Sequence, residues 1–302
     1  MLAATNEQGQ PPSVKKITLQ RKKQRVNQLL NIQPVAQADA AQSVLLMEVG
    51  PQHVFFGVMG MGNNEIQQVA FYSGNQQEEE VLLYQVFEKH PELKNSFYQV
   101  IIAWQVAQNI LIPEKFYQEQ STNTLLEVLH GQTNNHKVIS EKVEGFDFYN
   151  VYQAPQHMYD WMNRHYSHAK YLHGFTAGIR NIHFPPDETP QLIVDFKPSQ
   201  ITVYAIKHNQ LQLVQMFPYE SPADLVFYLA RICFQLGILQ QEVKIIIEGL
   251  IDESSAAYAS LHKYFTHVQF GQVPDHVRFT EDFKEYPAHF FSSIYKLAAC
   301  VS

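Results

Sequence analysis

The stretch that decides the fold is residues 191–249, which read QLIVDFKPSQ ITVYAIKHNQ LQLVQMFPYE SPADLVFYLA RICFQLGILQ QEVKIIIEG. Residues 191–196, 201–206 and 211–217 are rich in branched and aromatic side chains, and short polar turns separate them. Such runs predict three strands joined as a meander. The last connection contains Asn209, a residue that tolerates the left-handed conformation of tight hairpin turns.

A helix and a fourth strand complete this unit. Ser221 is a good N-cap residue and Pro222 suits the first helical position, so we expect a helix to begin here and to end at Gly237. Residues 243–247 are mostly Val and Ile, which is typical of a strand that is covered on both faces. A strand that returns after a crossover helix can pair parallel to the first strand, so the unit predicts a mixed α/β layer.

The same order of elements occurs earlier in the chain. Three strand-like runs, a helix and a fourth strand are predicted at 44–49, 53–59, 66–72, 78–89 and 100–103. Glu48 and Asp195 end the first strands of the two copies and are 147 residues apart (195 − 48). Tyr72 and Tyr219 are also 147 apart (219 − 72), and Ala103 and Glu248 are 145 apart (248 − 103). A nearly constant separation predicts an internal duplication of one α/β unit.

The best linker in the sequence is PPDETP at 185–190, because three prolines in six residues forbid a helix. It stands directly before the second copy and predicts two lobes. The predicted segments are a basic and disordered extension at 1–42, a first lobe with a hairpin-helix insertion at 43–185, a linker at 186–190, and a second lobe at 191–302 whose last helix packs across the lobes.

The N-terminal extension differs from the rest of the chain in its charge. The chain has a net charge of −7, whereas residues 1–42 hold six basic and two acidic residues, which is +4. The basic residues are Lys15, Lys16, Arg21, Lys22, Lys23 and Arg25. A short basic helix over 15–30 is one interpretation, with contact to RNA, a ribosome or an anionic membrane as its function. A solvated tail is the alternative that composition favours.

Composition excludes some classes of protein. Two cysteines, Cys233 and Cys300, cannot form a disulfide framework or a metal site by themselves. No apolar run reaches the length of a membrane-spanning helix, and residues 1–10 lack the apolar core of a secretory signal. We therefore expect a cytoplasmic protein.

No catalytic motif stands out, and we predict neither a catalytic residue nor a metal site. His165 and His168 are three residues apart on a predicted helix that runs from Pro155 to about Leu172, a spacing that can hold a metal. Fourteen histidines make such pairs common, and His165 falls on the apolar face. A histidine in or beside the core is the favoured interpretation.

The duplicated unit resembles the actin-like ATPase superfamily, in which two ribonuclease H-like lobes carry mixed sheets flanked by helices. In that superfamily an acid and a glycine follow the first strand of each copy and serve Mg²⁺ and phosphate, and a Gly-Gly turn makes room for adenosine. The matching stretches here are Glu48-Val49-Gly50, Asp195-Phe196-Lys197 and Glu248-Gly249-Leu250. The resemblance thus implies Glu48, Gly50, Asp195, Lys197 and Gly249 as the residues that would meet ATP and Mg²⁺.

These turns depart from the superfamily pattern. Pro51 removes a backbone N–H, Lys197 replaces a glycine, and the adenosine turn keeps one glycine. We therefore expect no ATP turnover and no cofactor, and interpret the chain as a non-catalytic binding or assembly module with a protein partner. Nucleotide binding in the interlobe cleft remains the first alternative, and RNA or ribosome association through the basic segment the second.

At a finer level residues 43–300 resemble an uncharacterised bacterial family, domain of unknown function 3822. The residues that carry this resemblance are the Val44–Gly50 strand, the segment ILIPEKF at 110–116, the strand at 146–152 before Pro155, and the final helix ending in Cys300. The resemblance implies the actin-like fold and no particular activity.

Overall fold

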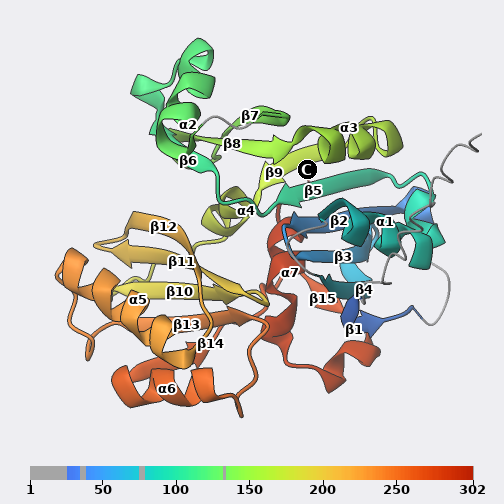
Figure 1. Cartoon of the computed structure of the whole chain (residues 1–302). Helices are drawn as coiled ribbons and strands as arrows, with labels where there is room; N and C mark the ends of the chain where they lie inside the picture. The colour runs from blue at the N-terminus through green and yellow to red at the C-terminus, as the bar shows by residue number, and fades with distance from the viewer. Residues whose placement is uncertain (1–25, 35–38, 75–78, 132–133, 302) are drawn as a thin grey trace, which may run out of the picture.

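The computed structural model describes residues 26–34, 39–74, 79–131 and 134–301. In these residues, two mixed sheets form two lobes, and a smaller sheet extends from the first lobe (Figure 1). The α/β class with duplicated lobes is therefore confirmed.

The first sheet has seven strands in the order β1-β4-β3-β2-β5-β9, with β15 paired to β4. Its strands are β1 (Asn27–Ile32), β2 (Ser43–Gly50), β3 (His53–Gly60), β4 (Glu65–Ser73), β5 (Gln99–Trp104), β9 (Lys170–His173) and β15 (Arg278–Phe279). Strands β2 and β3 are buried along their whole length, because helices cover both faces of this sheet.

The second sheet has the order β12-β11-β10-β13-β14. Its strands are β10 (Gln191–Phe196), β11 (Gln200–Lys207), β12 (Gln210–Pro218), β13 (Lys244–Gly249) and β14 (His267–Phe270). The order matches β4-β3-β2-β5-β9 of the first sheet, strand for strand. The registers agree as well, since Glu48 lies beside Ala103 and Asp195 lies beside Glu248 in the parallel pairs. The predicted duplication and these pairings are confirmed.

One predicted pairing is wrong. Val54 of β3 lies opposite Tyr72, whereas the equivalent Ile201 of β11 lies opposite Phe217 and not Tyr219. The first hairpin encloses four residues between Gly60 and Glu65, while the second encloses only His208 and Asn209. Both of these residues have a φ of 52°. The tighter turn shortens the separation from 147 to 145 residues, and that separation is kept to the closing strand.

The third sheet, in the order β6-β8-β7, is the predicted insertion. It contains β6 (Asn109–Pro113), β7 (His136–Lys142) and β8 (Phe148–Pro155), flanked by α2 (Thr122–His130) and α3 (Gln156–His165). The predicted hairpin is present. The helix expected from Pro155 to Leu172 is shorter, because α3 ends at His165 and β9 follows.

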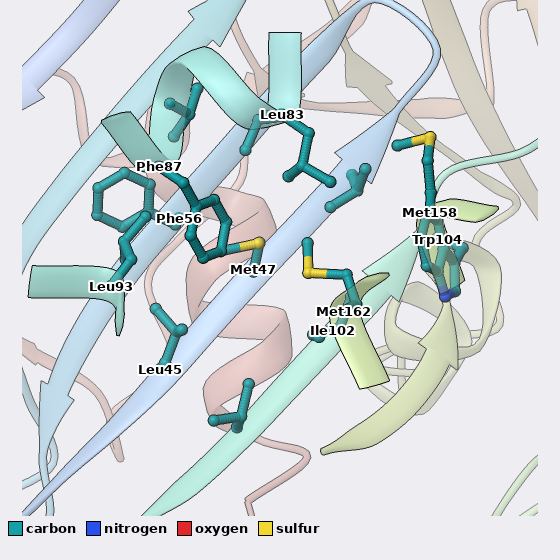
Figure 2. Packing of buried hydrophobic residues seen from close by; sticks show 14 of the residues in the cluster. Leu45, Met47, Phe56, Leu83, Phe87, Leu93, Ile102, Trp104, Met158 and Met162 are labelled. Atoms are coloured by element: carbon teal, nitrogen blue, oxygen red, sulfur yellow. The ribbon is translucent and has the colours of Figure 1, made fainter. Parts of the chain in front are cut away.

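Two helices cover the outer face of the first sheet. Figure 2 shows α1 (Glu79–Lys89) and α3 contributing Leu83, Phe87, Met158 and Met162 to a core with side chains of β2, β3 and β5. On the second sheet, α5 (Pro222–Leu236) and α6 (Ala256–Tyr264) play the same part. Ser221 and Asp224 form a capping box at the start of α5, and Gly237 ends it in the left-handed conformation, as predicted.

Two short helices lie between the sheets. They are α4 (Gly174–Arg180) and α7 (Ser292–Ala298), and Figure 1 places α7 where the two lobes meet. Ile294 and Leu297 of α7 pack on the first sheet, and Phe175 and Ile179 of α4 pack on the second. After β14 the chain thus returns to the first sheet, through β15 and then α7. Residues 186–190, the predicted linker, run from α4 to β10 without a helix or strand.

Two further expectations are corrected. Residues 27–32 form β1, which pairs antiparallel with β4, so neither a helix over 15–30 nor a disordered segment extends that far. Residues 178–184 form an apolar run that also predicts a strand from sequence, but they are the end of α4 and a turn. In both segments the contacts that the residues make in the folded chain outweigh their local structural preference.

Candidate functional site

Three acidic side chains meet where the lobes face each other. Glu48 lies near the carboxyl end of β2, Asp195 near that of β10, and Glu248 near that of β13. Because β10 and β13 run parallel and in register, Asp195 and Glu248 are neighbours on one face of the second sheet. The duplication brings Glu48 to the matching place on the first sheet.

Lys197 joins the two lobes. Its Nζ lies 3.1 Å from Glu48 Oε1 in the first lobe and 3.3 Å from Asp195 Oδ1 in the second. It also donates to the hydroxyl of Ser293 at the start of α7. One ammonium group therefore contacts both lobes and the helix between them.

Lys296 of α7 holds the other two acids together. Its Nζ lies 3.1 Å from Asp195 Oδ2 and 2.5 Å from Glu248 Oε2. The neighbouring Tyr295 donates its hydroxyl to Glu248 Oε1 over 3.3 Å. Lys296 also lies over the ring of Tyr204, 5.5 Å from its centre. Each of the two Asp195 oxygens thus faces a different lysine.

His53 completes the cluster on the side of the first lobe. Its Nε2 lies 2.8 Å from Glu48 Oε1, and its ring stacks on Phe71 with the planes 9° apart. A side chain at Gly50 would place its Cβ 2.4 Å from Cε1 of this ring. The glycine that sequence reasoning assigned to phosphate thus makes room for a histidine.

The whole cluster is buried, and its charges depend on one another. Burial alone raises the pKa of Glu48, but Lys197 and the hydrogen bond from His53 outweigh it and hold that pKa well below its usual range. Burial lowers the pKa of Lys197, which Asp195 and Glu48 raise above the ordinary value. In the same way Asp195 and Glu248 outweigh burial and raise the pKa of Lys296 well above normal. Glu48, Lys197 and Lys296 are therefore charged at neutral pH.

Gly249 has a structural explanation. Its φ is +79°, and an added Cβ would lie 2.2 Å from the carbonyl oxygen of Phe196 and 2.6 Å from Asp195 Oδ1. Only glycine adopts this conformation freely and allows the two parallel strand ends to approach so closely. The predicted adenosine glycine is thus packed against the neighbouring strand.

A cavity of about 670 Å³ opens beside the cluster, on the face of the second sheet that turns toward α7. Glu248 and Tyr295 form one end of its wall, and Gln191 and Lys244 line it farther along the strands. Gln191 is buried, and its Oε1 has no hydrogen-bond partner among the described residues. A second cavity of about 720 Å³, lined by residues such as Asp252, Glu253 and His289, lies past the ends of β13 and β14.

The structure brings all the predicted site residues together: Glu48, Gly50, Asp195, Lys197 and Gly249 lie within or against this cluster. Sequence reasoning missed His53, Tyr295 and Lys296. A signal for Lys296 was present, since it is the one charged residue in the helix sequence SSIYKLA at 292–298. A buried lysine needs a carboxylate partner, but the sequence does not say which one.

Other predicted features lie elsewhere. His165 and His168 are exposed, so His165 is not inside the core. It lies beside the core, the other position expected for it: its ring packs on Trp161, and its Nδ1 faces the carbonyl oxygen of Trp161 at 2.8 Å. Residues 26–34, 39–74, 79–131 and 134–301 hold no group of three or more side chains suited to a metal ion. Lys15, Lys16, Arg21, Lys22, Lys23 and Arg25 lie outside the described residues, so nucleic-acid contact stays a prediction. No helix in the described part of the chain is long and apolar enough to cross a membrane.

Comparison with known families gives a direct assignment. The profile of the family described as "Protein of unknown function (DUF3822)" matches residues 33–268, well over half of the chain. The chain belongs to the DUF3822 family. No curated protein matches it significantly. The family match confirms the predicted family. The function of this family is unknown, so the function of the chain is inferred from the geometry of the site.

Solved structures confirm the fold of this DUF3822 chain. A protein from Bacteroides thetaiotaomicron VPI-5482 with an actin-like ATPase fold and unknown function is similar over 88% of this chain and 100% of that chain, with a TM-score of 0.74 and 18% identity. The PilM–PilN type IV pilus biogenesis complex is similar over 87% and 99%, with a TM-score of 0.61 and 11% identity. At such low identity these likenesses establish the actin-like ATPase fold alone.

Proposed function

We propose that this DUF3822 chain is a cytoplasmic, non-catalytic binding or assembly module of the actin-like fold that acts on a protein partner. The observation that carries the proposal is the position of Lys296, whose ammonium lies between Asp195 and Glu248. In this chain a lysine from the last helix contacts Asp195, an acid that the superfamily resemblance assigns to a metal ion.

Mg²⁺ and an ammonium group compete for the same carboxylate oxygens. Mg²⁺ needs oxygen ligands in near-octahedral geometry about 2 Å away and keeps several waters. Lys197 and Lys296 lie within 3.3 Å of the two Asp195 oxygens, and their positive charge repels a second cation. The residues present therefore do not fit a magnesium ion at Asp195.

The turns that would bind phosphate and adenosine do not fit a nucleotide either. A phosphate cradle consists of free backbone N–H groups that converge on the anion. Gly50 is covered by the ring of His53, and Pro51 has no N–H. Gly249 packs on Phe196 instead of leaving room for a ring. These contacts give both glycines a role in the folded chain without a nucleotide.

Two observations support a protein partner: the fold, and the buried ion-pair cluster around Lys197. The similar PilM structure was solved as a complex with PilN, which shows that a protein of this fold assembles with another protein. A cluster that links both lobes and α7 through Lys197 also favours one relative position of the lobes, which suits a module that presents a surface.

A thermal-shift titration with ATP and Mg²⁺ tests the proposal. A ligand at 100 times its Kd stabilises the native state by about 2.7 kcal/mol, which raises the melting temperature by several degrees in a chain of this size. We expect no rise at millimolar ATP and Mg²⁺. Magnesium alone and ATP with a chelator serve as controls for effects of salt.

The decisive contrary result is a saturable rise in melting temperature that Asp195→Asn abolishes. Such a result would establish nucleotide binding in the interlobe cleft, the alternative function. A rise that Asp195→Asn leaves unchanged would show ATP bound elsewhere and would leave the proposal for the cleft intact.

A further inference from the structure

The cavity of about 670 Å³ beside Glu248 has a floor made by the second sheet. Strands β10 and β13 run parallel and in register, so Gln191 lies beside Lys244. Two residues farther along, Ile193 lies beside Ile246. Side chains two residues apart in a strand point to the same face, and all four line the cavity. Its volume is within the range of about 300–1,000 Å³ in which proteins bind small molecules.

The first lobe shows how this face of the duplicated unit packs without a cavity. Val44 of the first copy corresponds to Gln191 of the second (191 − 44 is 147). Ala103 corresponds in the same way to Glu248 (248 − 103 is 145). Both Val44 and Ala103 are buried in an apolar core with Ile294 of α7. The second lobe thus has polar side chains and a cavity at positions that the first lobe fills with apolar packing.

Gln191 has a buried hydrogen-bonding group that the folded chain leaves unused. The residue is 4% exposed, and its Oε1 has no hydrogen-bond partner among the described residues. A buried acceptor without a donor costs free energy, and a valine like that at position 44 would avoid the cost. A polar group that is buried without a partner beside a cavity indicates a ligand that donates a hydrogen bond to it.

Lys244 is the only lysine or arginine in the described wall of the cavity, and no ion pair joins it to a described residue. The acids nearby do not neutralise it. Glu248 is bound by Lys296. Asp275, in the wall, and Asp187, near Lys244, are exposed and form no ion pair with it. An ammonium group without an acid beside it attracts a carboxylate, and hydrogen bonds between the two are about twice as strong as neutral ones.

We propose that this cavity binds a carboxylate that carries an N–H group on its α-carbon and an apolar side chain. A free amino acid and the C-terminal residue of a peptide both have this chemistry. Lys244 binds the carboxylate, and Gln191 accepts the hydrogen bond from the N–H group. The apolar side chain packs on Ile193 and Ile246. Gln191 and Lys244 begin β10 and β13, whereas the turns considered for ATP follow the strand ends, so the inference does not depend on the proposed function.

A series of matched small molecules tests the chemistry of the ligand. The probes are L-leucine and L-phenylalanine, for a free amino acid, and their N-acetyl derivatives, for a peptide C-terminus. We expect a saturable rise in the melting temperature of the full chain with at least one probe at millimolar concentration. A rise with the free amino acids alone identifies a free amino acid as the ligand, a rise with the acetylated probes alone identifies a peptide C-terminus, and a rise with both supports the shared chemistry.

Two analogues of the probe that binds best remove one contact each. The corresponding carboxamide lacks the carboxylate, and the corresponding acid without the nitrogen, 4-methylpentanoate for leucine, lacks the N–H group. Isothermal titration should show each analogue binding about tenfold or more weakly than the probe, because each loses one hydrogen-bonded group.

Two substitutions assign these contacts to residues. Lys244→Met should weaken the best probe about tenfold or more and reduce its affinity to that of the carboxamide. Gln191→Val, which introduces the residue of the first copy, should reduce the affinity of the probe to that of the acid without the nitrogen. The same variant should raise the melting temperature of the free chain, because the unpartnered amide is removed. Lys263→Met, at an exposed lysine of α6, should leave binding unchanged.

Three results overturn the site: no probe raises the melting temperature, the Lys244→Met chain binds the best probe as tightly as the wild type, or the Gln191→Val chain still prefers the probe to the acid without the nitrogen. A cooperative melting transition confirms that each variant is folded. If no probe binds and ATP causes no shift, this inference alone fails, whereas an ATP-dependent shift lost in Asp195→Asn refutes the proposed function alone.

Discussion

Gly50 and Lys197 occupy the same position in the two copies of one α/β unit, 147 residues apart (197 − 50), and Lys197 reaches across the lobes to Glu48, two residues before Gly50. The first copy has a glycine at this turn, and the second copy has a lysine. The cation neutralises Glu48 from the first lobe as well as Asp195 from its own. A position where the superfamily resemblance predicts contact with phosphate thus holds an internal ion pair.

Replacing Lys296 by Met should destabilise the chain by about 3–5 kcal/mol, because it leaves Asp195 and Glu248 as neighbouring buried carboxylates with one remaining lysine. Adding Glu248→Gln should recover part of the loss, since one of the uncompensated charges is removed as well. Urea unfolding of the single and double variants measures both values.

The matched control is Lys284→Met, which removes an exposed lysine paired with Glu281 and should cost no more than about 1 kcal/mol. Equal losses at the two lysines would contradict the role given to Lys296.

Glu141 predicts a dependence of stability on pH. Burial raises the pKa of Glu141 to about 7, although hydrogen bonds from Thr176 and the backbone N–H of His173 favour its charged form. The unfolded chain releases this proton near pH 4.5 and the folded chain near pH 7, so the folded state holds the extra proton between these values. The free energy of unfolding therefore falls as pH rises through this interval.

Replacing Glu141 by Gln should remove that loss. The free energy of unfolding of the variant should equal that of the wild type near pH 4.5. At pH 8 it should be larger by up to about 3 kcal/mol, because each unit of pKa shift corresponds to 1.36 kcal/mol. Thermal unfolding at a series of pH values checks the difference. Glu114→Gln, which removes an exposed partner of Lys142, should show no such trend, and a parallel trend in both variants would refute the role of Glu141.

Gly249→Ala should destabilise the chain by about 2–5 kcal/mol, because a positive φ costs a residue with a side chain about 1–2 kcal/mol and the new methyl group collides with Phe196. Gly62→Ala is the control, since an added methyl there meets no atom within 4 Å. Guanidinium unfolding compares the two. A tolerated alanine at 249 would show that the strand ends are not held this closely.

His208→Gly should stabilise the chain by about 0.5–1 kcal/mol. His208 and Asn209 both have a φ of 52°, a conformation that costs histidine more than asparagine. Glycine removes the strain but gains freedom in the unfolded chain, which offsets part of the benefit. Asn209→Gly should therefore gain less than His208→Gly, and the reverse order in calorimetry would contradict this explanation.

Local patterns predicted most of the sheets. Alternating and continuous apolar runs located β2, β3, β10, β11 and β13, and a Ser-Pro start located α5. The same reasoning failed at residues 27–32, where a weak helical pattern lies in a segment that pairs with β4. The pairing of β1 at the sheet edge depends on β4, a strand some 40 residues away, and the sequence of residues 27–32 alone does not predict it. The predicted Tyr72–Tyr219 equivalence failed because a turn two residues shorter moved the third strand.

The sequence by itself determined the repeated order of strands and helices and the placement of Glu48 and Asp195 at matching strand ends, because these follow from periodicity over short distances. Only the tertiary structure decided what those acids do. Lys296 lies 101 residues from Asp195 along the chain and reaches it only because α7 docks between the two sheets. The apolar face of α7 makes that docking favourable, and the docking in turn brings a buried ammonium to the carboxylates. Pairing between charges so far apart is set by packing, which local sequence patterns do not encode.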